Sequence, residues 1–125
     1  MSLIIRKPGI LTTVQDLGRF GGRRFGVNPS GVMDVAATRI INVLLGNEES
    51  APVLEMHFPA AEIEFADDTA FATGGADFGA EVNGASVANW RVTQASKGDV
   101  LRFTKRLRGN RAYLAVAGGV GATNG

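Results

Sequence analysis

A glycine-rich loop near the N-terminus holds the first residues that could do chemistry. Residues 12–26 read TTVQDLGRFGGRRFG and place Gln15, Asp16 and Arg19 among four glycines. An aspartate three residues from an arginine can hold the guanidinium in place for a carboxylate or phosphate group. Glycines let a ligand approach the backbone closely. Taken alone, however, the segment fits a structural turn better, with Asp16 and Arg19 satisfying backbone groups.

The segment NPSGVMD places Ser30 and Asp34 at the entrance of a predicted helix. Free N–H groups and the helix dipole favour an anion there, so an oxyanion or carboxylate site is one interpretation. Simple N-capping is the commoner alternative. Asp77 lies in a turn within TGGADFGAEVNG, where an aspartate usually bonds its own backbone.

Composition limits the chemistry that is available. The 125 residues include no cysteine and one histidine, which excludes a disulfide, a thiolate nucleophile and a multi-histidine zinc centre. We expect no bound metal. Any catalysis must therefore use carboxylates, hydroxyls, amides, cations and backbone groups.

Several classes of partner are not expected. No phosphate-binding loop of the G-x-x-x-x-G-K-[ST] type occurs, so any ATP would bind by another mode or in a partner. The basic segment 102–111 alternates with apolar residues and lacks exposed aromatic residues for stacking, so nucleic acid is not expected. No apolar run could span a bilayer and no signal peptide begins the chain, which indicates a cytoplasmic protein without a membrane partner.

Most of the hydrophobic periodicity is two, which predicts strands. Residues 53–58 (VLEMHF) and 62–65 (EIEF) alternate apolar and acidic or polar positions and are expected to be neighbours in one half-buried sheet, joined near Pro59. Glycine pairs and Asp or Asn residues mark frequent turns, among them Gly74-Gly75 and Gly109-Asn110. The spacing predicts a mainly β fold, a compact barrel or sandwich.

One helix is predicted in MDVAATRIINVLLGN, capped by Asp34 and stopped at Gly46. We expect an apolar face to be buried and a polar stripe to face solvent. The expected buried face is Met33, Ala36, Ala37, Ile40, Ile41, Val43 and Leu44. The polar stripe is Asp34, Thr38 and Asn42.

The net charge of +1 hides a block pattern. Residues 1–47 and 91–125 are mainly basic, whereas residues 48–90 contain nine acidic residues and no Lys or Arg. Such blocks could form opposed surface patches. The favoured interpretation is that basic and acidic strands lie side by side with cross-strand pairing.

These segments together resemble the biotin-dependent carboxyltransferase family. The matching motifs are KPGILTTVQDLGRFG, GVNPSGVMDVAATRIINVLLGN, APVLEM, GGADFGAEVNG, KGDVLRF and GNRAYLAVAGG, in the family's order and near its spacing. The resemblance runs from about Ile4 to Gly119. It is strongest to the branch that holds allophanate hydrolase subunit 2 and the C-type subunit of 5-oxoprolinase.

The resemblance implies a cyclophilin-like β-barrel lobe with one helix. Family domains are at least about twice as long, so residues 1–125 would form an N-terminal lobe of a truncated domain and be inactive alone. Two departures stand out: VGATNG follows Gly119 where relatives continue into a linker, and Pro59-Ala60-Ala61 replaces a glycine-rich connection.

The resemblance also implies a function. Bacterial 5-oxoprolinase uses A-type, B-type and C-type subunits together with ATP to open 5-oxoproline to L-glutamate, and this chain would be the C-type subunit. The alternatives are a carboxyltransferase or allophanate hydrolase subunit in urea degradation, which would need biotin, and a non-catalytic regulator that antagonises a kinase inhibitor. A small amide or lactam would be the substrate.

Transferred onto this sequence, the family motifs assign roles to six residues. Asp16, Arg19 and Ser30 would be catalytic: Arg19 would hold a substrate carboxylate or phosphate, Asp16 would orient Arg19, and Ser30 would donate to the carbonyl. The substrate-binding residues would be Gln15, Asp34 and Asp77.

Overall fold

The computed structural model describes residues 3–14 and 34–120, which form ten strands and one helix. Sheet A has the strand order β1 (Leu3–Lys7), β4 (Glu62–Phe65), β9 (Val100–Phe103), β6 (Ala80–Val82) and β7 (Ala85–Ser86). Sheet B has the order β2 (Ile10–Val14), β3 (Val53–His57), β10 (Arg108–Val116), β5 (Thr69–Asp77) and β8 (Thr93–Ala95). All these pairings are antiparallel.

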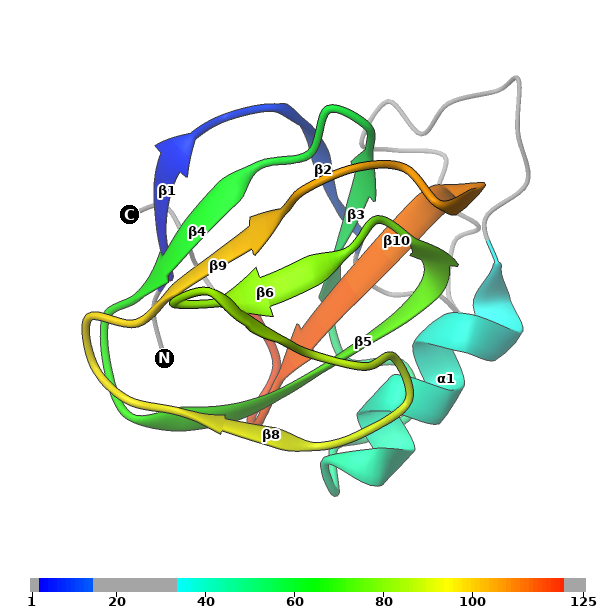
Figure 1. The fold of residues 1–125 in the computed structure, drawn as a ribbon. Coiled ribbons are helices and arrows are strands. Elements are labelled where there is room, and N and C mark those ends of the chain that lie inside the picture. The colour runs from blue at the N-terminus through cyan, green and yellow to red at the C-terminus, as the bar shows by residue number, and fades with distance from the viewer. Residues whose placement is uncertain (1–2, 15–33, 121–125) are drawn as a thin grey trace.

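The two sheets face each other around a shared apolar core (Figure 1). Phe65 of sheet A and Phe71 of sheet B are both fully buried, and their rings stack with centroids 5.0 Å apart. Alternating apolar residues line this interior, as the period of two requires. The predicted mainly β fold with one helix is confirmed, and the two-sheet arrangement is compatible with a barrel lobe.

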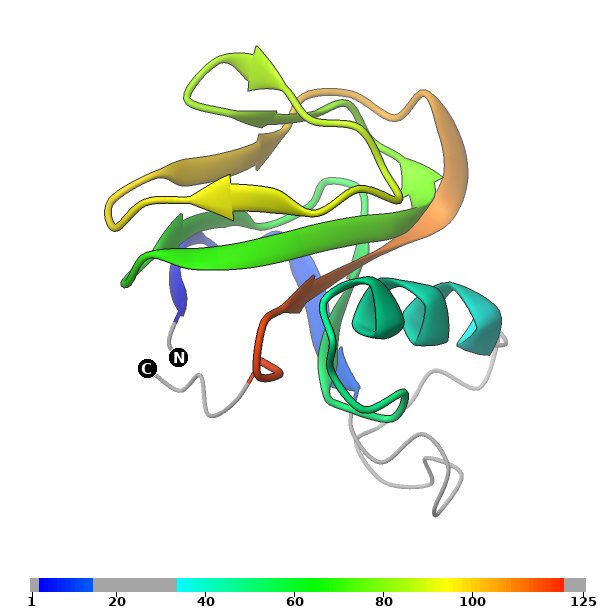
Figure 2. The same ribbon diagram turned by 90° about the horizontal axis from the view of Figure 1, so that it is seen from below.

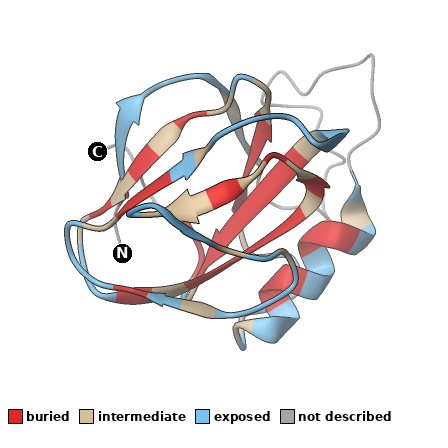
Figure 3. Cartoon of the chain, viewed as in Figure 1, coloured by how far each residue is buried: buried red, intermediate tan, exposed pale blue. Residues whose placement is uncertain are grey.

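Helix α1 (Val35–Leu44) covers the outer face of sheet B, on the opposite side from β6 and β9 (Figure 2). Ala37 and Ile41 pack there against Val53, Ala72 and Tyr113. The central strands of sheet B are therefore buried on both faces, which explains the continuous buried stretch at the end of β10 (Figure 3).

The expected burial of Ala37 and Ile41 in α1 is confirmed, but the rest of the expected orientation is wrong. Thr38 and Asn42, expected to face solvent, are fully buried, whereas Ile40 and Val43 are 47% and 56% exposed. Asn42 lies inward because its amide donates to the carbonyls of Glu49 (3.2 Å) and Ala51 (3.0 Å). These hydrogen bonds tie the chain after the helix to its inner face, and the satisfied amide can be buried at little cost.

Three expectations about the strands are also wrong. β3 and β4 follow one another in the chain but lie in different sheets, so the connection at Pro59 passes between layers. Gly74-Gly75 lies inside β5, and Gly109-Asn110 lies inside β10. Glycine in these strands marks close contacts and a register shift instead of chain reversals.

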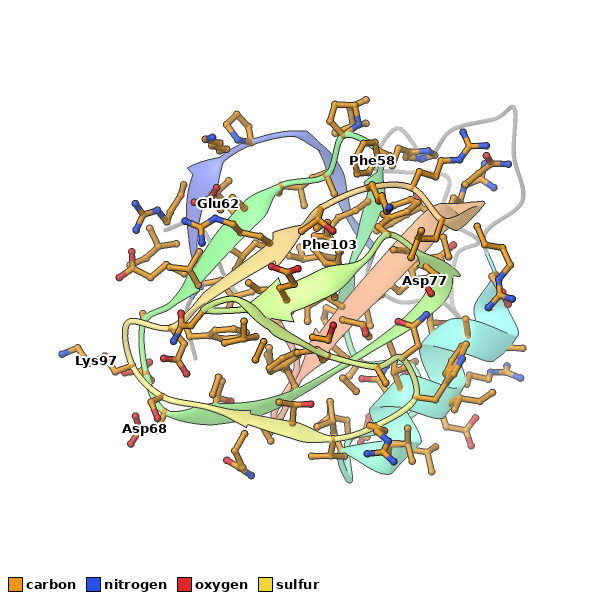
Figure 4. The ribbon with its side chains drawn as sticks, viewed as in Figure 1. Phe58, Glu62, Asp68, Asp77, Lys97 and Phe103 are labelled. Carbon is orange, nitrogen blue, oxygen red and sulfur yellow. The ribbon has the colours of Figure 1, made fainter. Side chains whose placement is uncertain are left out.

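The charge blocks pair across strands, as predicted. Glu62 of β4 is contacted by Arg6 (3.4 Å) and Lys7 (3.9 Å) of β1 on one side and by Arg102 (3.3 Å) of β9 on the other. Figure 4 places Glu62 on β4, and Glu64 adds a second contact to Arg6 at 3.3 Å. An acidic strand thus lies between two basic strands, which favours this strand order.

Because the Asn42 amide is buried and bonded, Asn42→Ala should lower the free energy of unfolding by about 2 kcal/mol through unsatisfied carbonyls and a small cavity. Val43→Ala, on the exposed face of the same helix, should change it by less than about 0.5 kcal/mol. Urea unfolding of both variants measures the difference. Equal losses would contradict the observed helix orientation.

Glu62→Gln should destabilise the protein by about 1 kcal/mol at low salt, because three cations lose one partly buried partner. The loss should shrink as sodium chloride is raised towards 1 M. Glu81→Gln is the control on β6 of the same sheet, since Glu81 forms no ion pair with any residue in the described ranges 3–14 and 34–120. A salt-independent loss for Glu62→Gln would argue against the cross-strand pairing as its cause.

Candidate functional site

A hollow of about 360 Å³ lies where β5 ends, β10 begins and α1 begins. Its walls combine two cations, a carboxylate, an amide, an indole and three small residues. They are Asp34, Gly75, Ala76, Trp90, Arg108, Gly109, Asn110 and Arg111. A polar concavity of this size suits a small molecule.

A register shift between β10 and β5 forms one wall of the hollow. Arg108 is opposite Asp77 and Ala112 is opposite Gly75, so three residues of β10 face one residue of β5. Gly109 permits this with φ of +85°, and a Cβ at Gly109 would lie 2.8 Å from the Ala76 Cβ. Such bulges redirect side chains, and this one brings Arg108 and Arg111 to the same concavity.

Trp90 forms another wall in an unusual backbone conformation. Its φ is +66°, which for a bulky residue costs about 1–3 kcal/mol. The Trp90 N–H donates to the carbonyl of Thr73 at 2.9 Å. The neighbouring Asn89 accepts from the Thr73 hydroxyl at 2.7 Å and donates to the carbonyl of Ala76 at 3.1 Å. The segment carrying Trp90 is thus hydrogen-bonded directly to β5.

A chain of hydrogen bonds that reaches into the buried layer anchors the helix beside the hollow. The Asp34 N–H donates to the Tyr113 hydroxyl at 3.0 Å, and that hydroxyl donates to the Glu55 carboxylate at 2.9 Å. Arg111 Nε lies 3.5 Å from the same carboxylate oxygen. Burial raises the pKa of Tyr113, and the hydrogen bond to Glu55 raises it further, so the phenol stays protonated.

Glu55 was expected on the polar face of a half-buried strand, and this expectation is wrong. The carboxylate points to the helix side of sheet B and is only 7% exposed. It is stabilised there by the Tyr113 hydroxyl and the Arg111 guanidinium. Paired and hydrogen-bonded in this way, a charge can remain buried.

Of the predicted site residues, Gln15, Asp16, Arg19 and Ser30 lie outside the described residues. Asp34 lines the hollow, and its carboxylate also accepts the Ala37 N–H at 3.0 Å, which confirms the predicted N-cap.

Asp77 is the last residue of β5 (Figure 4). Its carboxylate accepts the Gly79 N–H at 3.0 Å, as predicted for an aspartate that bonds the backbone of its own turn. It is absent from the residues that line the hollow. A substrate-binding role for Asp77 stays a prediction.

Sequence reasoning missed Trp90, Arg108 and Arg111 as residues of the hollow. The sequence signal that could have pointed to the bulge is Gly109-Asn110, which lies between the two arginines. A Gly-Asn pair normally predicts a turn, so it did not indicate a bulge within a strand. Among residues 3–14 and 34–120, no group of three or more potential ligands could hold a metal ion, and no helix is long and apolar enough to cross a membrane.

The chain matches a known protein family over most of its length. The family model for the carboxyltransferase domain, subdomains A and B, matches residues 25–124. The chain belongs to this carboxyltransferase domain family. The family resemblance seen in the motifs is therefore confirmed.

Curated relatives fall into two groups. The chain is 40% identical to the C-type subunit of 5-oxoprolinase from Escherichia coli over 94% of its own length, and 40% identical to the corresponding protein of Haemophilus influenzae over 86%. It is 38% identical to the urea amidolyase of Lachancea kluyveri over 93%. The chain spans 38%, 35% and 6% of these three relatives, respectively.

Solved structures of relatives have the same fold. A crystal structure of TTHA0988 superposes with a TM-score of 0.81 at 36% identity, covering 94% of this carboxyltransferase chain and 24% of the other. The Kluyveromyces lactis urea carboxylase superposes with a TM-score of 0.80 at 32% identity, covering 94% and 10%. The two-sheet fold of the described residues therefore aligns with part of each of these two longer chains.

Tyr113→Phe should lower the free energy of unfolding by about 1–3 kcal/mol near pH 7, because Glu55 and the Asp34 N–H each lose a buried partner. The pKa of Tyr113 is higher in the folded state, so its contribution is complete below about pH 10 and is lost as pH rises above that value. Denaturation at pH 7 and pH 11 should show a smaller stability difference between the two proteins at pH 11. A difference independent of pH would contradict the buried, protonated phenol.

Proposed function

We propose that this chain acts as the C-type subunit of a 5-oxoprolinase-type, amide-cleaving enzyme. The two bacterial relatives at 40% identity bear the name of that subunit and support the proposal. The fungal urea amidolyases support a second candidate, a role in urea degradation.

The pair of arginines in the wall of the hollow is the observation that favours the first candidate. Arg108 and Arg111 both line it, and Glu55 balances Arg111, whereas no carboxylate of residues 3–14 and 34–120 forms an ion pair with Arg108. 5-Oxoproline carries a carboxylate that a guanidinium can bind through two parallel hydrogen bonds, whereas urea is neutral.

The chemistry required is the opening of a resonance-stabilised amide. Water adds to the lactam carbonyl carbon, the carbon–nitrogen bond breaks, and the nitrogen takes up a proton, which gives L-glutamate. Fixed donors and cations that stabilise the developing oxyanion are the protein's contribution, and ATP hydrolysis drives the reaction.

The roles inferred from the family motifs complete this proposal. Arg19 holds a substrate carboxylate or a phosphate, Asp16 orients Arg19, and Ser30 donates to the carbonyl. Gln15 and Asp34 contact the substrate. Asp34 is the member of this group within the described residues, and its position in the wall of the hollow supports its assignment.

The chain works with partner subunits and with ATP. A-type and B-type subunits supply the remaining parts of the site, and ATP binds outside this chain, which has no phosphate-binding loop of the common type. Under the urea alternative, biotin on a carrier would be required instead.

Mixing the chain with A-type and B-type subunits, ATP and 5-oxoproline should release glutamate, and omission of any one component should abolish the release. Arg19→Ala should lower turnover about 100-fold or more without loss of fold, because a cation at the reacting group is removed. Glutamate is measured by an enzyme-coupled assay and the fold by circular dichroism.

Two results would contradict the proposal. Turnover of urea with a biotinylated carrier, without glutamate release, would establish the second candidate instead. Unchanged turnover by Arg19→Ala would remove that residue from the site.

A further inference from the structure

Trp90 is the most unusual residue in the wall of the hollow. Its backbone is left-handed, which is unfavourable for a bulky residue, and its side chain is half-exposed. Neither burial in the core nor the preference of a turn for this residue type therefore accounts for a tryptophan here. Strained, well-held residues of this kind cluster at ligand sites.

Gly74 supplies the space for the indole. A Cβ at Gly74 would lie 2.5 Å from Cζ3 and 2.8 Å from Cη2 of Trp90, and 2.9 Å from Cγ2 of Ile41. The six-membered ring therefore rests against the backbone of β5 beside α1. Because Asn89 and the Trp90 N–H are both bonded to β5, the backbone that carries the indole is held in place without a ligand.

Arg108 differs from the other arginine of the hollow. The Arg111 side chain is mostly buried and pairs with Glu55. Arg108 is exposed, and within the part of the chain that the structure describes it has no acidic side chain as an ion-pair partner. The hollow therefore presents an aromatic ring and an exposed cation. The one carboxylate among the described residues that line it, Asp34, accepts the Ala37 N–H as the helix N-cap.

We propose that Trp90 and Arg108 form a subsite for a small carboxylic acid that carries a planar amide group in a ring, such as a lactam acid. The ring of the ligand stacks on the indole, and its carboxylate pairs with the Arg108 guanidinium. The volume of about 360 Å³ accommodates a single small ring of this kind. The inference rests on the proposed function and names residues of this chain that contact its substrate.

Trp90 is the single tryptophan of the chain, so tryptophan fluorescence excited at about 295 nm reports the subsite directly. Titration with 5-oxoproline should give a saturable change in emission. The matched neutral ring, 2-pyrrolidinone, lacks only the carboxylate and should bind at least about tenfold more weakly, since it cannot pair with Arg108.

Two variants separate the carboxylate contact from general charge. Arg108→Gln should weaken 5-oxoproline binding about tenfold or more, down to the level of 2-pyrrolidinone. Arg106→Gln makes the same charge change two residues away, outside the lining of the hollow, and should leave binding unchanged. Equal weakening by both variants would show that only long-range charge attracts the acid and would overturn the subsite.

The stacking contact is tested by calorimetry, which does not need the indole. Trp90→Phe should retain part of the 5-oxoproline affinity and Trp90→Leu should lose it, with circular dichroism confirming that both variants fold. Acetate binding as tightly as 5-oxoproline would overturn the stacking contact.

These measurements use the chain without its proposed partners or ATP, so they are independent of turnover. Binding of 5-oxoproline without glutamate release in the complete mixture would refute the proposed function and leave the subsite intact. Glutamate release that is insensitive to Arg108→Gln, with no fluorescence change on titration, would refute the subsite and leave the function intact.

Discussion

The hydroxyl of Tyr113 joins the two layers on which the candidate site depends. It accepts from the backbone N–H of Asp34 at the start of the helix and donates to the buried Glu55 carboxylate, so one oxygen connects α1, β10 and β3. Because the Tyr113 hydroxyl and the Glu55 carboxylate are buried, each needs a partner, and the hydrogen bond from the Asp34 N–H ties the start of the helix to this pair. That position brings Asp34 to the mouth of the hollow.

The remaining walls depend on irregularities in sheet B. The register shift in β10 brings Arg108 and Arg111 to the hollow, and Gly74 in β5 makes room for the indole of Trp90. A regular antiparallel ladder would alternate side chains strictly between the two faces of the sheet. The hollow therefore depends on a bulge in β10 and on a residue without a side chain, Gly74, in the neighbouring strand β5.

The predictions succeeded where one local rule decided the outcome. Asp34 caps the helix, and the acidic strand β4 lies between basic strands. They failed where long-range contacts overrode local pattern. Asn42 is buried because the carbonyls of Glu49 and Ala51 accept from its amide, and hydropathy along the helix carries no information about those partners.

The sequence by itself determined the family, the mainly β class and the exclusion of thiol chemistry, because motif order, period-two alternation and residue counts are properties of the chain alone. Only the tertiary structure decided which face of α1 is buried and that Trp90, Arg108 and Asp34 line one hollow. These three residues are far apart along the chain. Their meeting is set by the strand order of sheet B and its register shift, both of which arise from packing between segments that no local window contains.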